Sequence, residues 1–231
     1  MNATAIRNAK TEDARRILDI YRYYVERTAI SFEYVTPSLP EFIERMEGIM
    51  SRYPYLVAER DGLILGYAYA HPFVGRAAYD WSAELTIYLD QNAQKCGLGR
   101  MLYEALEERL KEMGILNLYA CIGYPEKEDE YLTRNSADFH AHLGFRNVGT
   151  FRKCGYKFGH WYDMIWMEKL IGEHPDGQAP VRRPLFAILG EECYNPRIRR
   201  NIPHGNCESI SFFPVGSCAA VPDWFFLVYD M

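Results

Sequence analysis

The chain has 231 residues, of which 48% are hydrophobic and 25% charged, values that suit a globular protein of one domain with or without an appendage. A formal net charge of −5 without any basic run argues against a general nucleic-acid-binding protein. Residues 1–10 contain no apolar core of the kind a signal peptide has, and the sequence has no membrane-length apolar stretch and no Cys-x-x-Cys pair. We therefore expect a cytoplasmic protein with reduced thiols, away from membranes.

After a short first strand, hydrophobic periodicity predicts two helices and then three more strands in the first half of the chain. Thr11 is the expected N-cap of the first helix. Asp61-Gly62 is a strong signal for a hairpin between two of the strands. The predicted elements in chain order are a strand at 5–7, helices at 11–27 and from Ser38 or Pro40 to about 50, and strands at 55–60, 63–71 and 78–89.

A long amphipathic helix opens the second half of the chain, with Gly114 as its C-terminal stop. Asn135 or Ser136 is expected to cap a shorter helix. The predicted elements here are helices at 98–113 and 135–144 and strands at 116–122, 145–151 and 156–170. The full order, β-α-α-β-β-β-α-β-α-β-β, indicates a mixed α/β domain with one sheet and helices on both faces.

The composition of the chain changes after about Gly172. Residues 173–184 contain Gly, Pro and charge without periodicity, which predicts a linker after a domain at 1–172. Residues 185–231 show no coherent period, and three interpretations stay open: a poorly ordered tail, an element packed on the domain, or the product of an altered reading frame. We expect no independent function for this segment.

The most informative motif is Gln94-Lys95-Cys96-Gly97-Leu98-Gly99, at the transition from a strand to a helix. Its glycines let a ligand approach the backbone closely, and the unpaired N–H groups at a helix start attract a pyrophosphate. A dinucleotide fold would need a third glycine and a Walker loop would need Gly-Lys-Ser/Thr, and both are missing. On these residues alone, a tight strand-to-helix turn is the alternative.

The Gln-x-x-Gly-x-Gly pattern at Gln94–Gly99 resembles the acetyl-CoA motif of the GNAT superfamily, and further stretches resemble its phosphinothricin N-acetyltransferase branch. These stretches are Ser31-Phe32-Glu33, Gly66–Ala70 with Pro72-Phe73, Arg76, Ala78-Tyr79, Trp81-Ser82, Glu84, Ile87–Leu89, Leu143–Phe145, Gly155–Gly159 and Trp161–Asp163. The resemblance covers roughly residues 5–170. It implies a GNAT-type fold, with a mixed, mostly antiparallel central sheet and helices on both faces, and an acetyl-CoA-dependent N-acetyltransferase.

The same resemblance assigns the residues that hold acetyl-CoA. They are Ile87, Tyr88, Leu89, Gln94, Lys95, Cys96, Gly97, Leu98, Gly99, Arg100 and Asn135. It also implies that a backbone N–H near Tyr88 or Leu89 donates to the oxyanion formed in the attack, and it allows a homodimer. No metal is expected, because His140 and His142 point to different faces of a helix.

An amine attacks a thioester only in its unprotonated form, and a positioned base therefore accelerates the transfer. Glu84 corresponds to the general base of the branch, and burial among Tyr79, Trp81 and Tyr88 would raise its pKa. An exposed carboxylate on a strand face is the alternative. His140 corresponds to a His of the branch that serves the departing thiolate, with a His packed beside CoA or satisfied within its helix as the alternative.

The acceptor side of the predicted site contains one cation and several aromatic residues. Arg76 suits a substrate carboxylate, unless it is a solvated loop residue, and Phe32, Tyr79, Trp81 and Trp161 either wall a small pocket or pack in the core. These features favour a small-molecule amine acceptor of the phosphinothricin, methionine sulfoximine or methionine sulfone type. The alternatives are an enzyme for peptide or protein N-termini, which needs an open groove, and a non-catalytic CoA-binding module.

Overall fold

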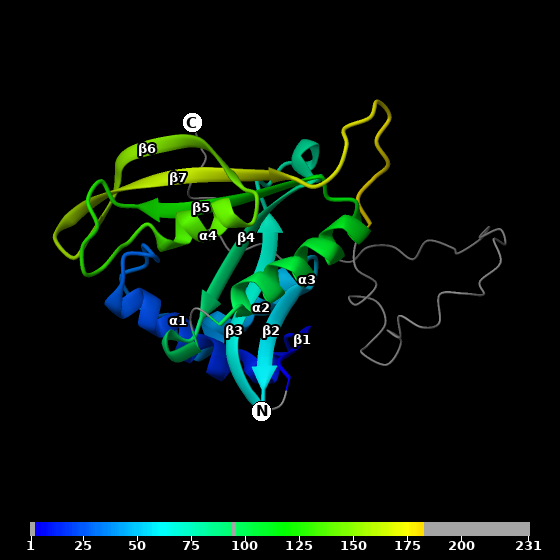
Figure 1. Ribbon diagram of the computed structural model, residues 1–231. Helices are drawn as coiled ribbons and strands as arrows, with labels where there is room; N and C mark the ends of the chain where they lie inside the picture. Colours follow the sequence, from blue (N-terminus) through cyan, green and yellow to red (C-terminus); the bar gives the residue numbers. More distant parts are fainter. Residues whose placement is uncertain (1–2, 94–95, 183–231) are drawn as a thin grey trace. The chain divides into compact units, whose positions relative to one another are not determined.

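The computed structural model describes residues 3–93 and 96–182, which form one α/β unit (Figure 1). Its strands are β1 (Ala5–Asn8), β2 (Tyr55–Arg60), β3 (Leu63–Pro72), β4 (Ser82–Leu89), β5 (Asn117–Tyr124), β6 (Arg146–Lys157) and β7 (His160–Leu170). Its α-helices are α1 (Ala14–Arg27), α2 (Leu39–Met50), α3 (Leu98–Met113) and α4 (Asn135–His142). The predicted order of helices and strands is confirmed.

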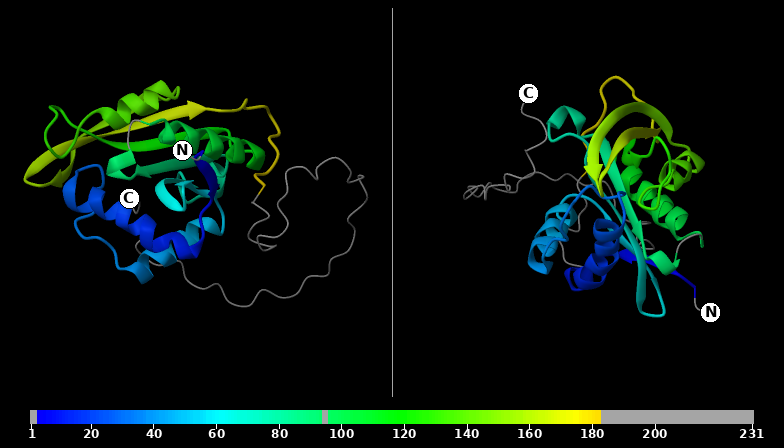
Figure 2. Two further views of the ribbon diagram at one scale, coloured as in Figure 1. Left: turned by 60° about the horizontal axis from the view of Figure 1, so that its bottom comes forward. Right: turned by 90° about the vertical axis from the view of Figure 1, so that its left-hand side faces the viewer.

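The seven strands form one sheet in the order β1-β2-β3-β4-β5-β7-β6. Every neighbouring pair is antiparallel except β4 and β5, which run parallel. Helices α1 and α2 cover one face of the sheet, and α3 and α4 cover the other, as the right-hand view of Figure 2 shows. The predicted fold class, a mixed and mostly antiparallel sheet between helices, is thus confirmed.

Side chains of the central strands alternate between the two helix layers. On β3, Tyr67 belongs to the core cluster with α1 and α2, whereas Ala68 belongs to the cluster with α3. Leu102, Leu106 and Leu110 of α3 are fully buried in that second cluster. Burying a side chain of this size stabilises the fold by roughly 1.5–3 kcal/mol, so this face of α3 fixes the helix on the sheet.

Strands β4 and β5 are paired over a short stretch only. Their registered pairs run from Ser82 opposite Asn117 to Glu84 opposite Tyr119. Beyond these residues, β4 continues its pairing with β3 alone and β5 continues with β7 alone. The two central strands therefore separate immediately after Glu84.

The predicted N-cap at Thr11 is wrong. Helix α1 begins at Ala14, after a 3-10 turn at 11–13. The Asp13 carboxylate closes this turn by accepting a hydrogen bond from the Lys10 N–H at 2.8 Å. Asp13 is the N-cap residue of α1, but its side chain makes no capping bond to the helix.

Two strand boundaries also differ from the prediction. Strand β4 begins at Ser82 rather than at residue 78, because a 3-10 turn precedes it. Strands β6 and β7 meet at Phe158-Gly159, whose φ angles of 51° and 83° are those of a type I′ hairpin turn. The sequence analysis placed a break between residues 151 and 156, but β6 continues through this stretch with a shift in its pairing register before Gly155.

Residues 173–182, predicted to belong to a linker, form no helix or strand but contact the domain. Trp81 Nε1 donates to Ala179 O at 2.9 Å, and the Arg182 N–H donates to Met113 O at 2.7 Å. The predicted tail at 185–231 lies outside the described residues. Within residues 3–93 and 96–182, no helix combines the length and apolarity needed to cross a bilayer.

Candidate active site

The first turn of α3 presents backbone donors that precede the helical ladder. Gly97, at the N-cap, has a φ of 82° and offers no side-chain acceptor. The first ladder bond is donated by the Met101 N–H to Gly97 O at 3.2 Å, so the N–H groups of Leu98, Gly99 and Arg100 come before it. These donors and the positive end of the helix dipole suit a pyrophosphate.

The loop ahead of α3 is organised by Asp90. The Asp90 carboxylate pairs with Arg16 of α1, and its carbonyl accepts from the Ala93 N–H at 2.9 Å. The ion pair ties the start of this loop to the opposite helix layer. Gln94 and Lys95, which the resemblance assigns to CoA binding, lie outside the described residues, so their roles stay predictions.

The two glycines of the motif differ in what they permit. Gly97 needs its positive φ, and nothing lies within 4 Å of the Cβ it lacks. A Cβ on Gly99 would lie 3.0 Å from the Phe139 ring of α4 and 3.6 Å from Ile87 Cδ1. Gly99 is therefore required for packing α3 against α4 and β4, a role that the sequence analysis did not foresee.

The end of β4 sends its side chains into both helix layers. Ile87 packs toward α3, whereas the Tyr88 ring lies 4.8 Å from the Tyr24 ring of α1. The Tyr24 hydroxyl donates to Leu89 O at 2.5 Å and accepts from the Leu89 N–H at 3.3 Å. One of the two expected oxyanion donors, the Leu89 N–H, therefore already has an acceptor.

Other N–H groups of β4 face the side on which β4 and β5 separate. The Asp90 N–H donates to Leu65 O on β3 at 2.8 Å. Because N–H directions alternate along a strand, the N–H groups of Leu85 and Ile87 point away from β3. The Leu85 N–H belongs to the last registered pair of β4 with β5, whereas the Ile87 N–H lies beyond it, so the Ile87 amide is the backbone donor that faces the separation.

A larger residue at Gly66 of β3 should displace the end of β4. An added Cβ would lie 2.5 Å from Leu89 Cδ2 and 3.1 Å from Tyr88 O. The carbonyl belongs to the backbone of β4, so we expect Gly66→Ala to cost about 1–3 kcal/mol and to weaken CoA binding. Urea unfolding and a CoA titration measure both effects. Gly48→Ala on α2, where nothing lies within 4 Å, is the matched control, and unchanged stability of Gly66→Ala would contradict the expectation.

Glu84 lies where β4 and β5 begin to separate, between His71 of β3 and Tyr119 of β5 in the register of the sheet. Its side chain is 17% exposed. Burial raises the pKa of Glu84 to about 8, because a poorly solvated site disfavours the charged form. Such a carboxyl group binds an amine proton more strongly than an ordinary one, which suits a general base.

The aromatic residues predicted to wall the acceptor pocket have different surroundings. Tyr79 and Trp161 are 43% and 61% exposed. Trp81 donates its indole N–H to the segment after β7. Phe32 packs over glycines of β5 and β6. Their roles as walls of the pocket and as neighbours of Glu84 stay predictions.

The other predicted ligand contacts are exposed. Arg76 lies in the loop between β3 and β4, and no carboxylate of the described residues pairs with it. Asn135 is the first residue of α4 and is exposed. Arg100 lies 3.6 Å from Glu104 along α3. These positions leave all three side chains accessible, and their assigned roles stay predictions.

His140 of α4 is buried, and both of its ring nitrogens have protein partners. Nε2 lies 3.0 Å from Tyr103 Oη, and Nδ1 lies 2.7 Å from Ser136 O. A carbonyl only accepts, so Nδ1 donates and Nε2 accepts the Tyr103 proton. Burial lowers the pKa of His140 to about 4. These contacts favour the alternative of a His satisfied in its helix, since acting on a thiolate requires loss of the Tyr103 bond.

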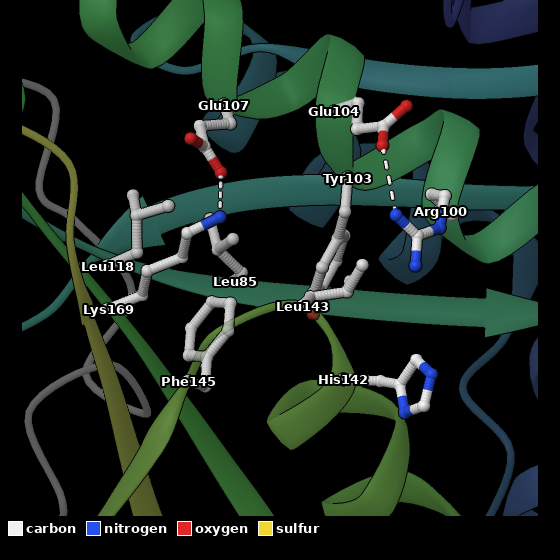
Figure 3. A pocket seen from close by; sticks show the side chains of 10 residues that line it. All are labelled: Leu85, Arg100, Tyr103, Glu104, Glu107, Leu118, His142, Leu143, Phe145 and Lys169. Carbon is white, nitrogen blue, oxygen red and sulfur yellow. Dashed lines mark hydrogen bonds and ion pairs between the residues drawn. The ribbon is translucent and has the colours of Figure 1, made fainter.

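A cavity of about 130 Å³ lies beneath α3, next to the start of the separation (Figure 3). Four charged side chains that line the cavity form two ion pairs: Glu107 with Lys169 at 2.6 Å, and Arg100 with Glu104. Leu85 lines this cavity, and side chains alternate along β4, so Glu84 faces the other helix layer. The cavity is thus separate from the carboxyl group.

Comparisons with known proteins agree with this geometry. Residues 6–166 match the model of the Acetyltransferase (GNAT) domain family. The chain is 36% identical over 177 residues to phosphinothricin N-acetyltransferase of Streptomyces viridochromogenes, a match that covers 77% of this chain and 92% of that protein. It is 28% identical to the L-methionine sulfoximine/L-methionine sulfone acetyltransferase of Salmonella typhimurium, over 73% of this chain and 95% of that protein.

The fold is also similar to the crystal structure of a GNAT superfamily phosphinothricin acetyltransferase from Sinorhizobium meliloti in complex with acetyl-CoA. The TM-score is 0.69 at 31% identity, with 78% of this chain and 97% of that chain covered. The protein is therefore an acetyl-CoA-dependent N-acetyltransferase. The chain belongs to the GNAT acetyltransferase family, in its phosphinothricin N-acetyltransferase-like branch.

Proposed function

We propose that the enzyme acetylates the amino group of a small amino-acid-like substrate of the phosphinothricin, methionine sulfoximine or methionine sulfone type. The observation that carries the proposal is the buried Glu84 carboxyl group at the separation of β4 and β5. The two curated relatives, which are named for these substrates, support it. Arg76, exposed in the loop between β3 and β4, is the residue to which we assign the acceptor carboxylate.

In the proposed reaction, Glu84 removes a proton from the acceptor ammonium group. The first turn of α3 holds the pyrophosphate, and the Ile87 N–H group is the oxyanion donor. Acetyl-CoA supplies the acyl thioester. The freed amine nitrogen bonds to the acetyl carbon as the carbon–sulfur bond breaks, with direct transfer between the two substrates.

The test is acetyl-CoA-dependent thiol release with phosphinothricin, methionine sulfoximine, methionine sulfone and a set of N-terminal peptides. We expect turnover of the three amino-acid analogues well above the background without amine. The Arg76→Gln variant should raise KM for these carboxylates more than for a matched amine without a carboxylate. Turnover of the peptides alone would overturn the small-substrate proposal in favour of a peptide acetyltransferase.

A further inference from the structure

A second titratable side chain lies beside Glu84. His71 of β3 is its register partner, and His71 Nε2 lies 3.7 Å from Glu84 Oε1. Both side chains are largely buried, with 23% and 17% of their surface exposed. We propose that His71 is the proton-accepting partner of Glu84: it takes the Glu84 proton and so prepares the carboxylate for the acceptor ammonium. This inference rests on the proposed role of Glu84 as the base.

The backbone fixes which nitrogen of His71 faces Glu84 as a proton acceptor. His71 Nδ1 lies 3.1 Å from Pro72 O. A carbonyl oxygen only accepts, so Nδ1 carries the proton of the neutral ring. Nε2 then has a free lone pair on the side of Glu84. At 3.7 Å the two groups are too far apart for a direct hydrogen bond, and one bridging water or a small side-chain rotation closes the gap.

Burial sets the resting positions of the protons. It raises the pKa of Glu84 to about 8 and lowers the pKa of His71 below its ordinary value. Near pH 7 the pair therefore holds one proton, which resides mainly on Glu84. A Glu84 that keeps this proton cannot accept another, so the proton must leave before Glu84 acts as a base, and His71 Nε2 is the acceptor beside it. Moving the proton to Nε2 creates a carboxylate and an imidazolium, which stabilise each other.

Among the titratable groups around Glu84, His71 is the neutral base that can accept a proton. The Glu84 charge also acts on Tyr69 of β3, Tyr103 of α3 and Cys121 of β5, and the pKa values of all three are raised, chiefly by burial. Tyr119, opposite Glu84 on β5, has a raised pKa as well. From the helix layer, Glu33 and Arg45 pair with each other at 2.6 Å. These phenols and the thiol stay protonated and neutral near pH 7, so they do not accept the Glu84 proton.

The protons balance over one turnover. The Glu84 proton passes to His71 Nε2, and Glu84 then takes one proton from the acceptor ammonium. As the nitrogen–carbon bond forms and the carbon–sulfur bond breaks, the nitrogen loses its second proton and the thiolate gains one. His71 releases its proton to solvent, and Glu84 ends protonated as it began. His71 acts through Glu84 and is a positioning residue rather than a catalytic one.

The test is the dependence of kcat/KM on pH, from about pH 6 to about pH 9.5, in the wild type, His71→Leu, His71→Gln and Glu84→Gln. The amine's own titration is common to all variants and cancels in their ratios. We expect kcat/KM of both His71 variants to fall about tenfold for each unit below pH 8, because Glu84 alone is ionised tenfold less per unit. The wild-type profile should level off on the acid side, where proton transfer to His71 supplies the carboxylate. Near pH 9 the kcat/KM of the His71 variants should approach that of the wild type. His160→Gln, at an exposed position on β7, is the matched control.

The outcomes separate the two proposals. If Glu84→Gln is inactive but the His71 profiles overlay the wild type, the role of His71 is overturned and the base stands. If Glu84→Gln keeps full activity, the proposed function of Glu84 falls, and this inference falls with it. If His71→Gln alone restores the wild-type profile, His71 acts only through hydrogen bonding, and proton transfer to it is overturned.

A second readout does not need turnover. Nitrogen-15 chemical shifts of His71 report its protonation directly. We expect the His71 pKa to fall in Glu84→Gln, because the carboxylate that stabilises the imidazolium is gone. Equal His71 titration in both proteins would overturn the coupling, and unchanged folding is checked in the same spectra.

Discussion

Replacing Glu84 by glutamine should lower kcat by about 10²- to 10⁴-fold, the usual contribution of a positioned general base. The amide keeps the size of the side chain but cannot take a proton from the acceptor ammonium. The Glu84 side chain faces the layer of α1 and α2, on the other side of the sheet from the first turn of α3. The affinity for CoA should therefore stay within about twofold. Steady-state kinetics with saturating acetyl-CoA and a direct CoA titration measure the two quantities.

The same variant should be at least as stable as the wild type at neutral pH. The folded-state pKa of Glu84, about 8, lies above its ordinary value of 4.5. Its contribution to stability is therefore fully present below pH 4.5 and is lost as the pH rises through 8. The glutamine removes this loss, so the thermal midpoint at pH 8 should rise while activity falls. Such a trade is expected where a site holds a strained or poorly solvated group.

A carboxylate in the same row of the sheet controls for nonspecific effects. Glu168 of β7 lies opposite Tyr119 in the register and pairs with the exposed Arg146 at the sheet edge. Glu168→Gln should leave kcat unchanged, because this carboxylate pairs with Arg146 and does not lie where β4 and β5 separate. Equal losses in Glu84→Gln and Glu168→Gln would refute a specific role for Glu84.

The fold could be predicted from local patterns wherever one signal dominated. The apolar face of α3 and its Gly114 stop gave the helix its observed bounds, and Asp61-Gly62 marked a hairpin turn with two positive φ angles. The equivalent turn at Phe158-Gly159 was missed, because phenylalanine rarely adopts a positive φ. There the Phe158 ring stacks on Tyr131 at 4.4 Å, a tertiary contact that compensates for a turn residue no local rule would choose.

The candidate site, like the fold, could be predicted only in part from the sequence. The place of Glu84 on a buried strand followed from the sequence, and the helix start at Gly97 was also placed correctly. His71 was missed because its position opposite Glu84 depends on the register between β3 and β4, across a loop without a fixed turn type. A signal was present: His71 shares the strand face of Tyr67 and Tyr69, so alternation alone places a buried His in that layer.

Lys157, at the end of β6, is a further residue whose role only the three-dimensional structure reveals. It is 2% exposed, and its ammonium group donates to three carbonyls at the end of α1: Val25 O at 2.8 Å, Thr28 O at 2.9 Å and Ser31 O at 2.5 Å. The last carbonyls of a helix lack ladder partners, and a cation there is stabilising. Burial lowers the pKa of Lys157 to about 8. The bonds hold the segment that leads to Phe32.

Lys157→Met should therefore destabilise the fold by roughly 3–5 kcal/mol, the cost of removing one member of a buried charged network. Methionine fills a similar volume but leaves three carbonyls without their donor, each of which is costly to bury unpaired. Lys153→Met, an exposed position on the same strand, is the matched control and should change the free energy of unfolding by less than about 0.5 kcal/mol. Urea midpoints measure both. A loss below about 1 kcal/mol in Lys157→Met would mean that water replaces the ammonium group, and the end of α1 would then depend on packing rather than on this cation.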